Sequence, residues 1–526
     1  MSNDRLAIHM MGRQTLGDLL WRSTCRVPDK TAIIYGDTRL SYAQLDELAN
    51  RTAHALAERG IGKGERVALL SHNHYLFVVL HFALARLGAI LVPVNFMLTG
   101  EDVAYIVDHS GATGLIVEDA LLPVAEAALA LAHHPVGLRG VIPELGLALP
   151  AGWESVEDWT RHPSTQMPQV EIADDDPLQI LYTSGTESRP KGATLSSRNL
   201  IAQYASCIID GEMSGRDTEV HALPLFHCAQ LHGLLVPALS LGATNIILSN
   251  PEPARLLATV EAERVSKLFC PPTVWISLLR HPDFDRRDLS CLTKGYYGAS
   301  IMPGEVIKEL LRRLPQIRLF NFYGQTEMCP VATLLRPEDQ LRKLGSAGRA
   351  VLHVETRVVD DDGQPLPPGQ IGEIVHRGPH VMLGYWNDPE KTAEAFRHGW
   401  FHSGDLGVLD DEGYLTVVDR KKDMIKTGGE NVASREVEEV IYQHAAVAEV
   451  AVIGVPHPHW IEQVTAVVVL RTGEALPPDE LLAFCRERLA HFKAPKEIVF
   501  VDAMPKNAAG KLLKRELRTL LADRTR

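Results

Sequence analysis

The sequence has few cysteines and no excess of positive charge. Seven cysteines are spread over 526 residues, and no two of them form a CxxC pair. This excludes a disulfide framework and a zinc site built on paired cysteines, and it indicates reduced thiols in a cytoplasmic setting. The formal net charge of −13 at pH 7 disfavours binding to nucleic acid or to an anionic membrane.

Long apolar runs are also missing. The most apolar segment, residues 75–98, is typical of a buried core, because polar and helix-breaking residues interrupt it (His81, Arg86, Gly88 and Pro93). The first residues, MSNDRLAIHMMGRQTL, lack the apolar region of a signal peptide. We therefore expect a cytoplasmic protein without a transmembrane segment.

The pattern of β-rich and helical segments predicts an α/β fold with more than one domain. Up to about residue 330 the two kinds alternate, which indicates two βα-layered sheet subdomains with parallel strands. Beyond residue 345, hairpin signals such as DDDGQPLPPG predict a small β-barrel-like subdomain. The charged tract VVDRKKD predicts a boundary between an N-terminal domain, residues 1–419, and a small mobile α+β domain, residues 420–526. The polar stretch 150–177 is predicted to be a surface loop.

The segment YTSGTESRPKG, residues 182–192, follows an apolar strand and is suited to holding an anion. Backbone N–H groups at a strand end can converge on a phosphate, hydroxyls add donors, and Lys191 adds a charge. The spacing is not that of the GxxxxGK[ST] loop. A loop of this composition is by itself more often a plain turn.

Four further motifs favour the functional interpretation. NFYGQTE (321–327) offers a carboxylate for Mg²⁺, and GWFHSGDLG (399–407) offers one for ribose hydroxyls. DRKKDMIKTGGEN (419–431) joins cations to a Gly-Gly turn, and PKNAAGK (505–511) ends on a lysine after small residues. Each one taken alone is more often a solvated or capping segment.

In this order and spacing the five motifs resemble those of the adenylate-forming superfamily, which contains acyl-CoA synthetases, peptide-synthetase adenylation domains and beetle luciferases. The resemblance covers about residues 15–520. It implies that a carboxylate and MgATP give an acyl-adenylate and pyrophosphate, after which the CoA thiol takes the acyl group and AMP leaves. ATP, Mg²⁺ and CoA are the implied cofactors and co-substrates.

The resemblance also assigns roles to individual residues. Lys511 would orient the carboxylate, Thr326 would contact the α-phosphate, and Glu327 would support Mg²⁺. The remaining positions are Thr183, Ser184, Gly185, Thr186 and Lys191 for the β- and γ-phosphates, with Thr186 also near the metal; Gly298, Ala299, Tyr323 and Gly324 around adenine; Asp405 and Arg420 for the ribose; Lys422 as the hinge; and Gly428 and Gly429 for the passage of pantetheine.

The domain motion implied by the resemblance uses one pocket for both half-reactions. The C-terminal domain would rotate about Lys422 after adenylation, which removes Lys511 from the site. The rotation brings Gly428 and Gly429 in, where the thiol can pass close to the backbone.

The stretch LPLFHCAQLHG, residues 223–233, resembles the family motif beside the acyl pocket. Amino-acid-activating relatives place an aspartate near here, whereas this chain has His227, so the ammonium group of an amino acid would be buried without a partner. Small and apolar neighbours favour a medium- or long-chain fatty acid, with an aromatic acid as an open alternative. His227 is a candidate for gating the pocket or contacting the carboxylate, and a packed histidine is the equal alternative.

Other readings of the same motifs stay open. A carrier-protein phosphopantetheine could replace CoA as acceptor; the absence of an obvious insertion between residues 348 and 419 favours free CoA. Oxidation of an adenylate, as in luciferases, is a second alternative. A non-catalytic binder is disfavoured because every catalytic position is present. The sequence leaves open whether the chain is a monomer or a homodimer.

Two residues of the phosphate loop depart from the family pattern TSGTTGxPKG. Glu187 and Ser188 stand where threonine and glycine are usual. An acid here would repel phosphate unless it points away, so we expect Glu187 to pair with a cation of the open loop. Glu187→Thr is then expected to alter the KM for ATP.

Overall fold

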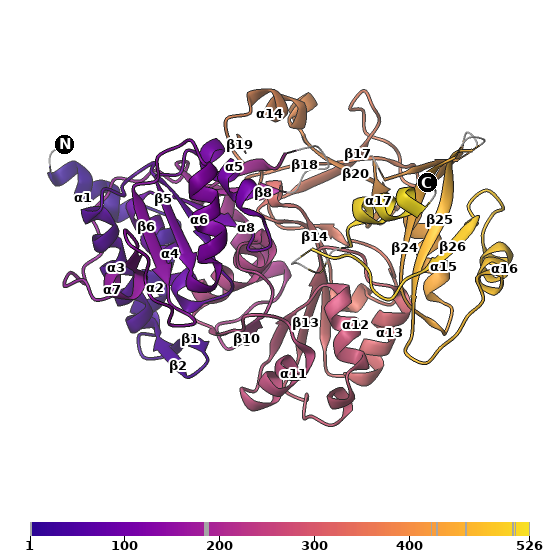
Figure 1. Ribbon diagram of the computed structural model, residues 1–526, viewed down its shortest axis with the longest axis horizontal. Coiled ribbons are helices and arrows are strands. Elements are labelled where there is room, and N and C mark those ends of the chain that lie inside the picture. Colours follow the sequence, from indigo (N-terminus) through magenta and orange to yellow (C-terminus); the bar gives the residue numbers. More distant parts are fainter. Residues whose placement is uncertain are drawn as a thin grey trace.

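The computed structural model describes residues 3–183, 189–421, 423–427, 430–457, 460–507, 510 and 512–524, with the backbone alone for 3–7 and 522–524. Within this part of the chain four β-sheets organise the fold. Two large sheets with their helices form the body of the molecule, a small sheet lies above them, and a separate C-terminal unit, coloured yellow, lies to one side (Figure 1).

The first large sheet has nine strands in the order β16-β15-β14-β13-β12-β10-β11-β1-β2. Its centre from β14 to β1 is parallel, whereas β15, β16 and β2 pair antiparallel at the edges. The strands are β1 (Thr31–Tyr35), β2 (Thr38–Ser41), β10 (Thr218–His221), β11 (Thr244–Ile247), β12 (Lys267–Phe269), β13 (Lys294–Gly298), β14 (Arg318–Gly324), β15 (Val331–Leu335) and β16 (Arg349–Ala350).

The second large sheet has eight strands in the order β19-β9-β8-β4-β3-β5-β6-β7. It is parallel from β8 to β7 and ends in the antiparallel strands β9 and β19, so the predicted parallel pairing holds for the centre of both sheets. The strands are β3 (Arg66–Leu70), β4 (Ile90–Val94), β5 (Gly114–Glu118), β6 (Leu138–Ile142), β7 (Glu154–Ser155), β8 (Pro177–Thr183), β9 (Lys191–Ser196) and β19 (Gly384–Tyr385).

Helices cover these sheets, and the buried apolar residues form three large clusters, one of which includes strands of both sheets. A capping box at Ser41 and Gln44 starts α3, and α4 is buried along almost its whole length. The helices are α1 (Asn3–Gly12), α2 (Leu16–Arg26), α3 (Tyr42–Glu58), α4 (Tyr75–Leu87), α5 (Gly100–Ser110), α6 (Leu122–Leu131), α7 (Val156–Trp159), α8 (Ser197–Asp210), α9 (Cys228–Gln230), α10 (Val236–Leu241), α11 (Pro253–Ala262), α12 (Pro272–Arg280), α13 (Gly304–Arg313) and α14 (Pro389–Ala395), with a π-helical turn at Leu231–Leu235.

The stretch 150–177 is not the plain surface loop that its polar sequence predicts. It contains β7 and α7, and both Trp153 and Trp159 are buried. The ring of Trp159 lies so close to Gly140 of β6 that a Cβ there would be 2.4 Å away. Elements this short depend on such long-range contacts, so local periodicity does not reveal them.

The two remaining sheets are small. An antiparallel sheet of four strands contains β17 (Glu355–Val359), β18 (Gly372–Arg377), β20 (Phe401–Leu409) and β21 (Leu415–Arg420). The C-terminal unit is α+β, as predicted, with a five-stranded sheet and three helices among its described residues: β22 (Ile425–Thr427), β23 (Glu430–Val432), β24 (Val447–His457), β25 (Ile461–Leu470), β26 (Glu497–Phe500), α15 (Ser434–Tyr442), α16 (Pro478–Arg488) and α17 (Lys514–Arg524).

Polar contacts dock the C-terminal unit on the rest of the chain. The guanidinium of Arg435 donates to the backbone carbonyls of Val417 and Gly345, the latter at 2.7 Å. The carboxylate of Glu439 accepts the backbone N–H of Gly304 at 3.1 Å. Polar contacts of this kind are typical of interfaces between domains that move relative to one another. The exact boundary at residue 419 stays a prediction.

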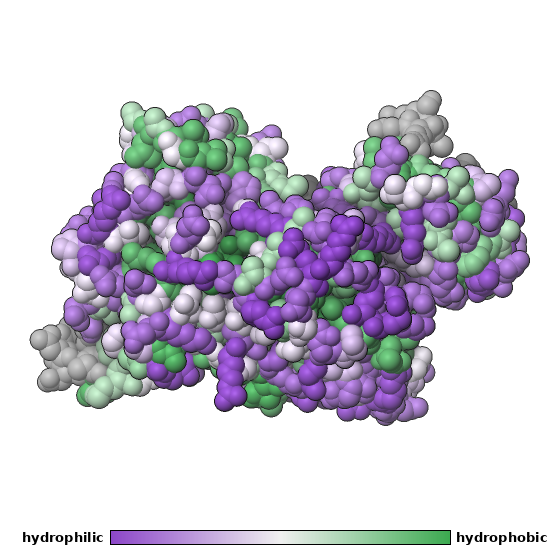
Figure 2. All heavy atoms as spheres, turned by 90° about the horizontal axis from the view of Figure 1, so that it is seen from below, coloured by the Kyte–Doolittle hydropathy of each residue, from purple (hydrophilic) through white to green (hydrophobic). Residues whose placement is uncertain are grey.

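The face of the molecule in Figure 2 is mainly polar: hydrophilic side chains predominate on it, and apolar ones form smaller groups between them. None of the described helices combines the length and the apolarity needed to cross a membrane.

One ion pair lies inside the first sheet. Lys267 on β12 is the register partner of Glu219 on β10, and its Nζ lies 2.8 Å from Glu219 Oε2 with both side chains almost fully buried. Desolvation of two charges is costly, and the mutual attraction offsets it only while both partners are present.

We therefore expect Lys267→Met to destabilise the protein by about 3–5 kcal/mol, because it leaves a buried carboxylate uncompensated. The double variant Lys267→Met/Glu219→Gln should recover much of this loss. Urea unfolding followed by tryptophan fluorescence measures both. Equal losses in the single and double variants would contradict the assignment, and Lys308→Met, at the exposed pair with Glu305, is the matched control.

Candidate active site

The turn that carries Glu327 depends on a close backbone approach at the end of β14. Gly324 has φ 155°, and a Cβ at this position would lie 2.0 Å from the carbonyl oxygen of Pro330. Only glycine allows the strand to pass so near residues 330–332. The chain then forms a 3₁₀ turn, Thr326–Met328, which holds the candidate catalytic residues Thr326 and Glu327 at the edge of the sheet.

Glu327 is held by a hydroxyl and lies within range of two cations. Its Oε1 accepts a hydrogen bond from the Tyr385 hydroxyl at 2.9 Å, and Lys191 Nζ lies 5.3 Å from the centre of the Tyr385 ring. Burial raises the pKa of Glu327, while the Tyr385 hydroxyl and the charges of Arg420 and Lys191 oppose that rise. A carboxylate in this position remains available to a hard cation.

The donor set fits Mg²⁺ shared with a nucleotide better than a cage built by protein alone. No group of three or more acidic, histidine or cysteine side chains suited to a metal occurs among the residues that the structure describes. Mg²⁺ commonly uses one or two carboxylates together with substrate phosphates and water. Glu327 can provide the carboxylate; Thr186, the second predicted metal residue, lies outside the described residues.

The candidate ribose site is formed by two neighbouring strands. Asp405 on β20 and Arg420 on β21 are register partners, with Arg420 Nε 3.7 Å from Asp405 Oδ1. The Tyr323 hydroxyl donates to Asp405 Oδ2 at 2.8 Å. This bond joins the end of the first sheet to the small sheet, and orients the carboxylate that is predicted to bind ribose hydroxyls.

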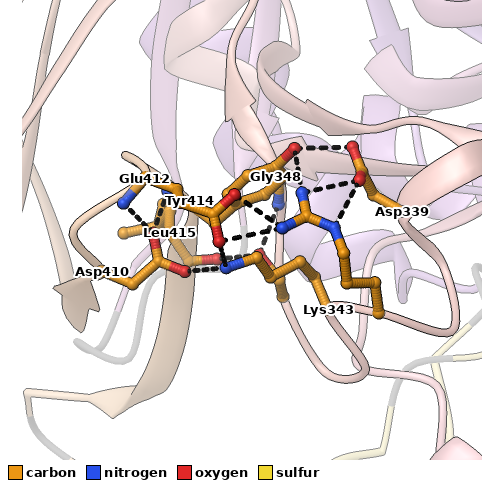
Figure 3. A network of polar contacts seen from close by, with 9 residues as sticks. Asp339, Lys343, Gly348, Asp410, Glu412, Tyr414 and Leu415 are labelled. Atoms are coloured by element: carbon orange, nitrogen blue, oxygen red, sulfur yellow. Dashed lines mark hydrogen bonds and ion pairs between the residues drawn. The ribbon is translucent and has the colours of Figure 1, made fainter.

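A polar network anchors the far end of this hairpin (Figure 3). Lys343 Nζ lies 2.6 Å from both Asp410 and Glu412 at the hairpin turn, and the Tyr414 hydroxyl donates to Asp339 at 2.6 Å. Backbone pairing of Leu415 with Gly348 adds a direct link to the large sheet. The turn is thus fixed to the body of the molecule, which sets the position of Asp405 at the other end of β20.

The candidate adenine wall lies at the neighbouring end of β13. Gly298 faces Phe322 across the sheet, and a Cβ on Gly298 would lie 2.4 Å from the Phe322 carbonyl oxygen. Ala299 follows with φ 63°. With Tyr323 and Gly324 on β14, these residues lie on adjacent strand ends, as the sequence predicts for a nucleotide site of α/β sheets.

The base of the predicted phosphate loop is the hairpin of β8 and β9. Thr183 and Lys191 are register partners at its end, and Lys191 Nζ lies near the ring of Tyr385, whose hydroxyl binds Glu327. Ser184, Gly185, Thr186 and the two unusual residues Glu187 and Ser188 lie outside the described residues. The expectation for Glu187 therefore stays a prediction.

His227 has a local structural role. Its Nδ1 accepts the backbone N–H of Ala229 at 3.2 Å and so caps the short helix α9. A catalytic role for His227 stays a prediction. The next residue, Cys228, is buried, and its pKa is raised by burial and by the neighbouring Cys329 and Glu327, so this segment lies beside the Glu327 turn.

The predicted residues of the C-terminal unit lie largely outside the described part. This applies to Lys422, Gly428, Gly429 and Lys511. Gly510 is described, and its carbonyl accepts a hydrogen bond from Thr273 Oγ1 of α12 at 3.1 Å. Gly510 itself therefore lies against α12, in the N-terminal part of the chain.

Sequence reasoning missed Tyr385. It lies in LGYWNDPE, where an aromatic residue before a turn is usually a packing residue, so no local signal marks it. Only the folded chain brings its hydroxyl to Glu327, from a strand that is distant in sequence.

Together these strand ends, cations and carboxylates define the class of the protein, which is a nucleotide-binding enzyme. More narrowly, the chain belongs to the AMP-binding enzyme family, whose model matches residues 20–386, and the model of the AMP-binding enzyme C-terminal domain matches residues 436–511. These matches and the relatives below confirm the superfamily resemblance and the mixed α/β architecture.

Similar proteins extend over nearly the whole chain. A feruloyl-CoA synthase of Amycolatopsis sp is 38% identical over 97% of this chain and 99% of its own length. The long-chain-fatty-acid–CoA ligase FadD13 of Mycobacterium tuberculosis is 37% identical over 92% of this chain and 93% of its own. The crystal structure of the anthranilate CoA ligase AuaEII with anthranoyl-AMP superposes with a TM-score of 0.90 at 27% identity, covering 97% of this chain and 98% of that one.

The hydrogen bond from Tyr385 to Glu327 makes the pH dependence testable. Because the bond stabilises the carboxylate, Tyr385→Phe should raise the pKa of Glu327 further above its usual 4.5. Metal binding needs the ionised form, so activity is lost as the pH falls, and the acidic limb of kcat/KM for MgATP should move to higher pH.

Tyr35→Phe is the matched control, because it removes a similar bond, to Glu144 at 2.7 Å, in another part of the molecule. An unmoved limb in Tyr385→Phe, or the same shift in both variants, would contradict the role of Tyr385.

Proposed function

We propose that this AMP-forming acyl-CoA ligase acts on hydrophobic carboxylic acids, and foremost on medium- or long-chain fatty acids. The observation that carries the adenylation chemistry is the convergence of Glu327, Lys191 and the Asp405–Arg420 pair at the ends of three sheets. A carboxylate for Mg²⁺, a cation for phosphate and an acid for ribose hydroxyls are the groups that MgATP requires.

In the first half-reaction the carboxylate oxygen of the acid attacks the α-phosphorus of ATP, and the bond to the bridging oxygen breaks to release pyrophosphate. Lys191 and the phosphate loop, at whose base it stands, neutralise the β- and γ-phosphates. Thr326 contacts the α-phosphate. Bound Mg²⁺ would further neutralise the polyphosphate, with Glu327 among its ligands. In the second half-reaction the CoA thiol loses its proton and attacks the acyl carbon, and AMP leaves.

The proposed acyl wall is apolar. Cys228 and Leu231 next to His227 pack with Met328, Cys329 and Ala332 in one core cluster, all of them buried. This lining supports an aliphatic chain. The fatty-acid ligase FadD13 among the relatives is in keeping with this choice.

An aromatic acid is the second candidate, and a buried polar group supports it. Tyr204 OH lies 2.6 Å from His232 Nδ1 in the layer behind Cys228, and the ring of His81, whose two nitrogens have no hydrogen-bond partner, lies 5.5 Å from that of His232. Polar groups of this kind can select a hydroxylated ring. The relatives named feruloyl-CoA synthase and indoleacetate–CoA ligase, both 38% identical, favour the same alternative.

A panel of saturated acids from short to long, together with benzoates, cinnamates and indole acetate, separates the two candidates. We expect acid-dependent pyrophosphate release to have its highest kcat/KM with a medium or long aliphatic acid. A preference for a hydroxylated aromatic acid would overturn the fatty-acid assignment, and no release with any acid would overturn adenylation itself.

We also propose that free CoA is the acceptor, in a cytoplasmic setting. The seven cysteines are all unpaired thiols, which supports a reducing compartment. Acyl-CoA formed from acid, ATP and CoA supports the choice. If acyl-AMP is retained until a carrier protein with phosphopantetheine is added, the chain is instead a ligase that loads a carrier protein. Sedimentation distinguishes a monomer from a homodimer.

The proposed two-conformation cycle predicts different effects on the two half-reactions. Lys511→Ala removes a charge aimed at the first transition state, so adenylation should slow by about 10²–10³-fold. Thioester formation from supplied acyl-AMP and CoA should remain close to that of the unchanged protein. Both steps are followed by rapid quench, with the exposed Lys308→Ala as control. Equal loss in both half-reactions would refute the assignment of Lys511 to adenylation alone.

A further inference from the structure

One face of α15 docks the C-terminal unit through two charged side chains that lie one helical turn apart. The Arg435 guanidinium donates to the backbone carbonyls of Val417 and Gly345, and the Glu439 carboxylate accepts the backbone N–H of Gly304. All three backbone groups belong to the chain before residue 419, whereas α15 follows it. We call the pair Arg435 and Glu439 the α15 clasp.

The surroundings of Arg435 are shaped to receive a guanidinium. Gly345 has φ 79°, and a Cβ there would lie 2.9 Å from Arg435 Nη2. Burial lowers the pKa of Arg435, while Glu439 and Glu438 on the same helix oppose that shift. Both carbonyls that accept from Arg435 lie outside the C-terminal unit, so these bonds exist only while the two units are docked.

Glu439 binds the end of a helix that lacks a side-chain cap of its own. Gly304 is the first residue of α13, and Pro303 at the N-cap position provides no side-chain acceptor. The first N–H groups of a helix have no partner within the helix, and they attract negative charge. The Glu439 carboxylate therefore binds this end of α13 both as a hydrogen-bond acceptor and through its charge. The two helices are neighbours in Figure 1.

The docked arrangement also places the residue that precedes Lys511. The Gly510 carbonyl accepts a hydrogen bond at 3.1 Å from Thr273, near the start of α12. That end of α12 follows β12, which pairs with β13, the strand that ends at the candidate adenine wall. At the other end of α12, Arg280 donates to the carbonyl of Ala448 at 3.2 Å. The clasp and the placement of Gly510 thus belong to one arrangement of the two units.

We propose that the α15 clasp positions the C-terminal unit for adenylation and opens before thioester formation, so that Arg435 and Glu439 set the balance between the two half-reactions. The inference rests on the proposed two-conformation cycle. A rotation about Lys422 turns α15 away from the body of the molecule and breaks the three bonds of the clasp together. Contacts that exist in one arrangement alone favour that arrangement. Both side chains are positioning residues, because they act through the placement of Lys511.

The first test follows the two half-reactions in Arg435→Met and Glu439→Ala. Each variant loses hydrogen bonds made by a charged group, so the docked arrangement becomes less populated, and acid-dependent pyrophosphate release in a single turnover should slow by about tenfold. Thioester formation from supplied acyl-AMP and CoA should be unchanged or faster, since the unit leaves the docked arrangement more easily. Glu439→Gln, whose amide oxygen can still accept the N–H of Gly304, should recover most of the lost adenylation rate.

Matched controls are Glu436→Ala and Arg488→Met. Glu436 lies on the same helix as the clasp but pairs with Lys493 inside the C-terminal unit at 2.7 Å, and Arg488 lies over the ring of Phe484 in that unit. Neither control should change the ratio of the two rates. Equal slowing of both half-reactions in the clasp variants would overturn the proposal, because it indicates a general loss of structure. An unchanged adenylation rate in both would also overturn it.

A measurement without turnover separates failure of the clasp from failure of the proposed function. The tract RKK, residues 420–422, offers trypsin three sites at the predicted boundary. Undocking makes this boundary more accessible, so both clasp variants should be cut there faster than the unchanged protein and the controls. Faster cutting without any acid-dependent pyrophosphate release would support the clasp as the docking contact and remove adenylation. Release by the unchanged protein, with no difference in cutting or in either half-reaction, would overturn the clasp and leave adenylation in place.

Discussion

The close approach of β14 to residues 330–332 is the constraint on which the candidate site depends. Gly324 has no room for a side chain, because its Cβ would overlap the Pro330 carbonyl. That contact lets the chain turn at once into the segment of Thr326 and Glu327. It also leaves Tyr323 one residue before the end of the strand, where its hydroxyl reaches Asp405 on another sheet. One backbone contact thus sets the geometry of both the metal-binding and the ribose-binding candidates.

Electrostatics at this centre differ from those of the whole molecule. The chain carries a net negative charge, yet Lys191 and Arg420 both act on the partly buried carboxylate of Glu327. Burial alone would keep Glu327 protonated at a higher pH than a solvated acid. The Tyr385 hydroxyl and the nearby cations offset this effect and favour the ionised form. Lys191 and Arg420 also favour the binding of a polyphosphate, because its negative charge balances their positive charge.

Much of the fold could be predicted from sequence, because its signals are local, and the candidate site positions come from motifs that are equally local. The apolar segment from residue 75 is buried, as its sequence predicts, and the capping box at Ser41 depends only on residues three apart. The register of Asp405 with Arg420 follows from a hairpin whose two strands are close in sequence. By contrast, the polar sequence around the short helix α7 predicts a loop. The burial of this helix depends on contact with Gly140 of another strand, which no local pattern reveals. His227 is a catalytic candidate because of its place in the motif. In the structure it also caps the short helix α9, a role that other N-cap residues can fill.

The sequence by itself determined the family and the reaction class and proposed the residues for MgATP, because these depend on residue type and spacing along the chain. The tertiary structure alone decided which groups surround them. Tyr385 reaches Glu327 from a strand at the edge of a different sheet, and Arg189 and Lys391 meet in one pocket although about 200 residues separate them. Such contacts arise from the packing of sheets against each other, and no local pattern of residues encodes them.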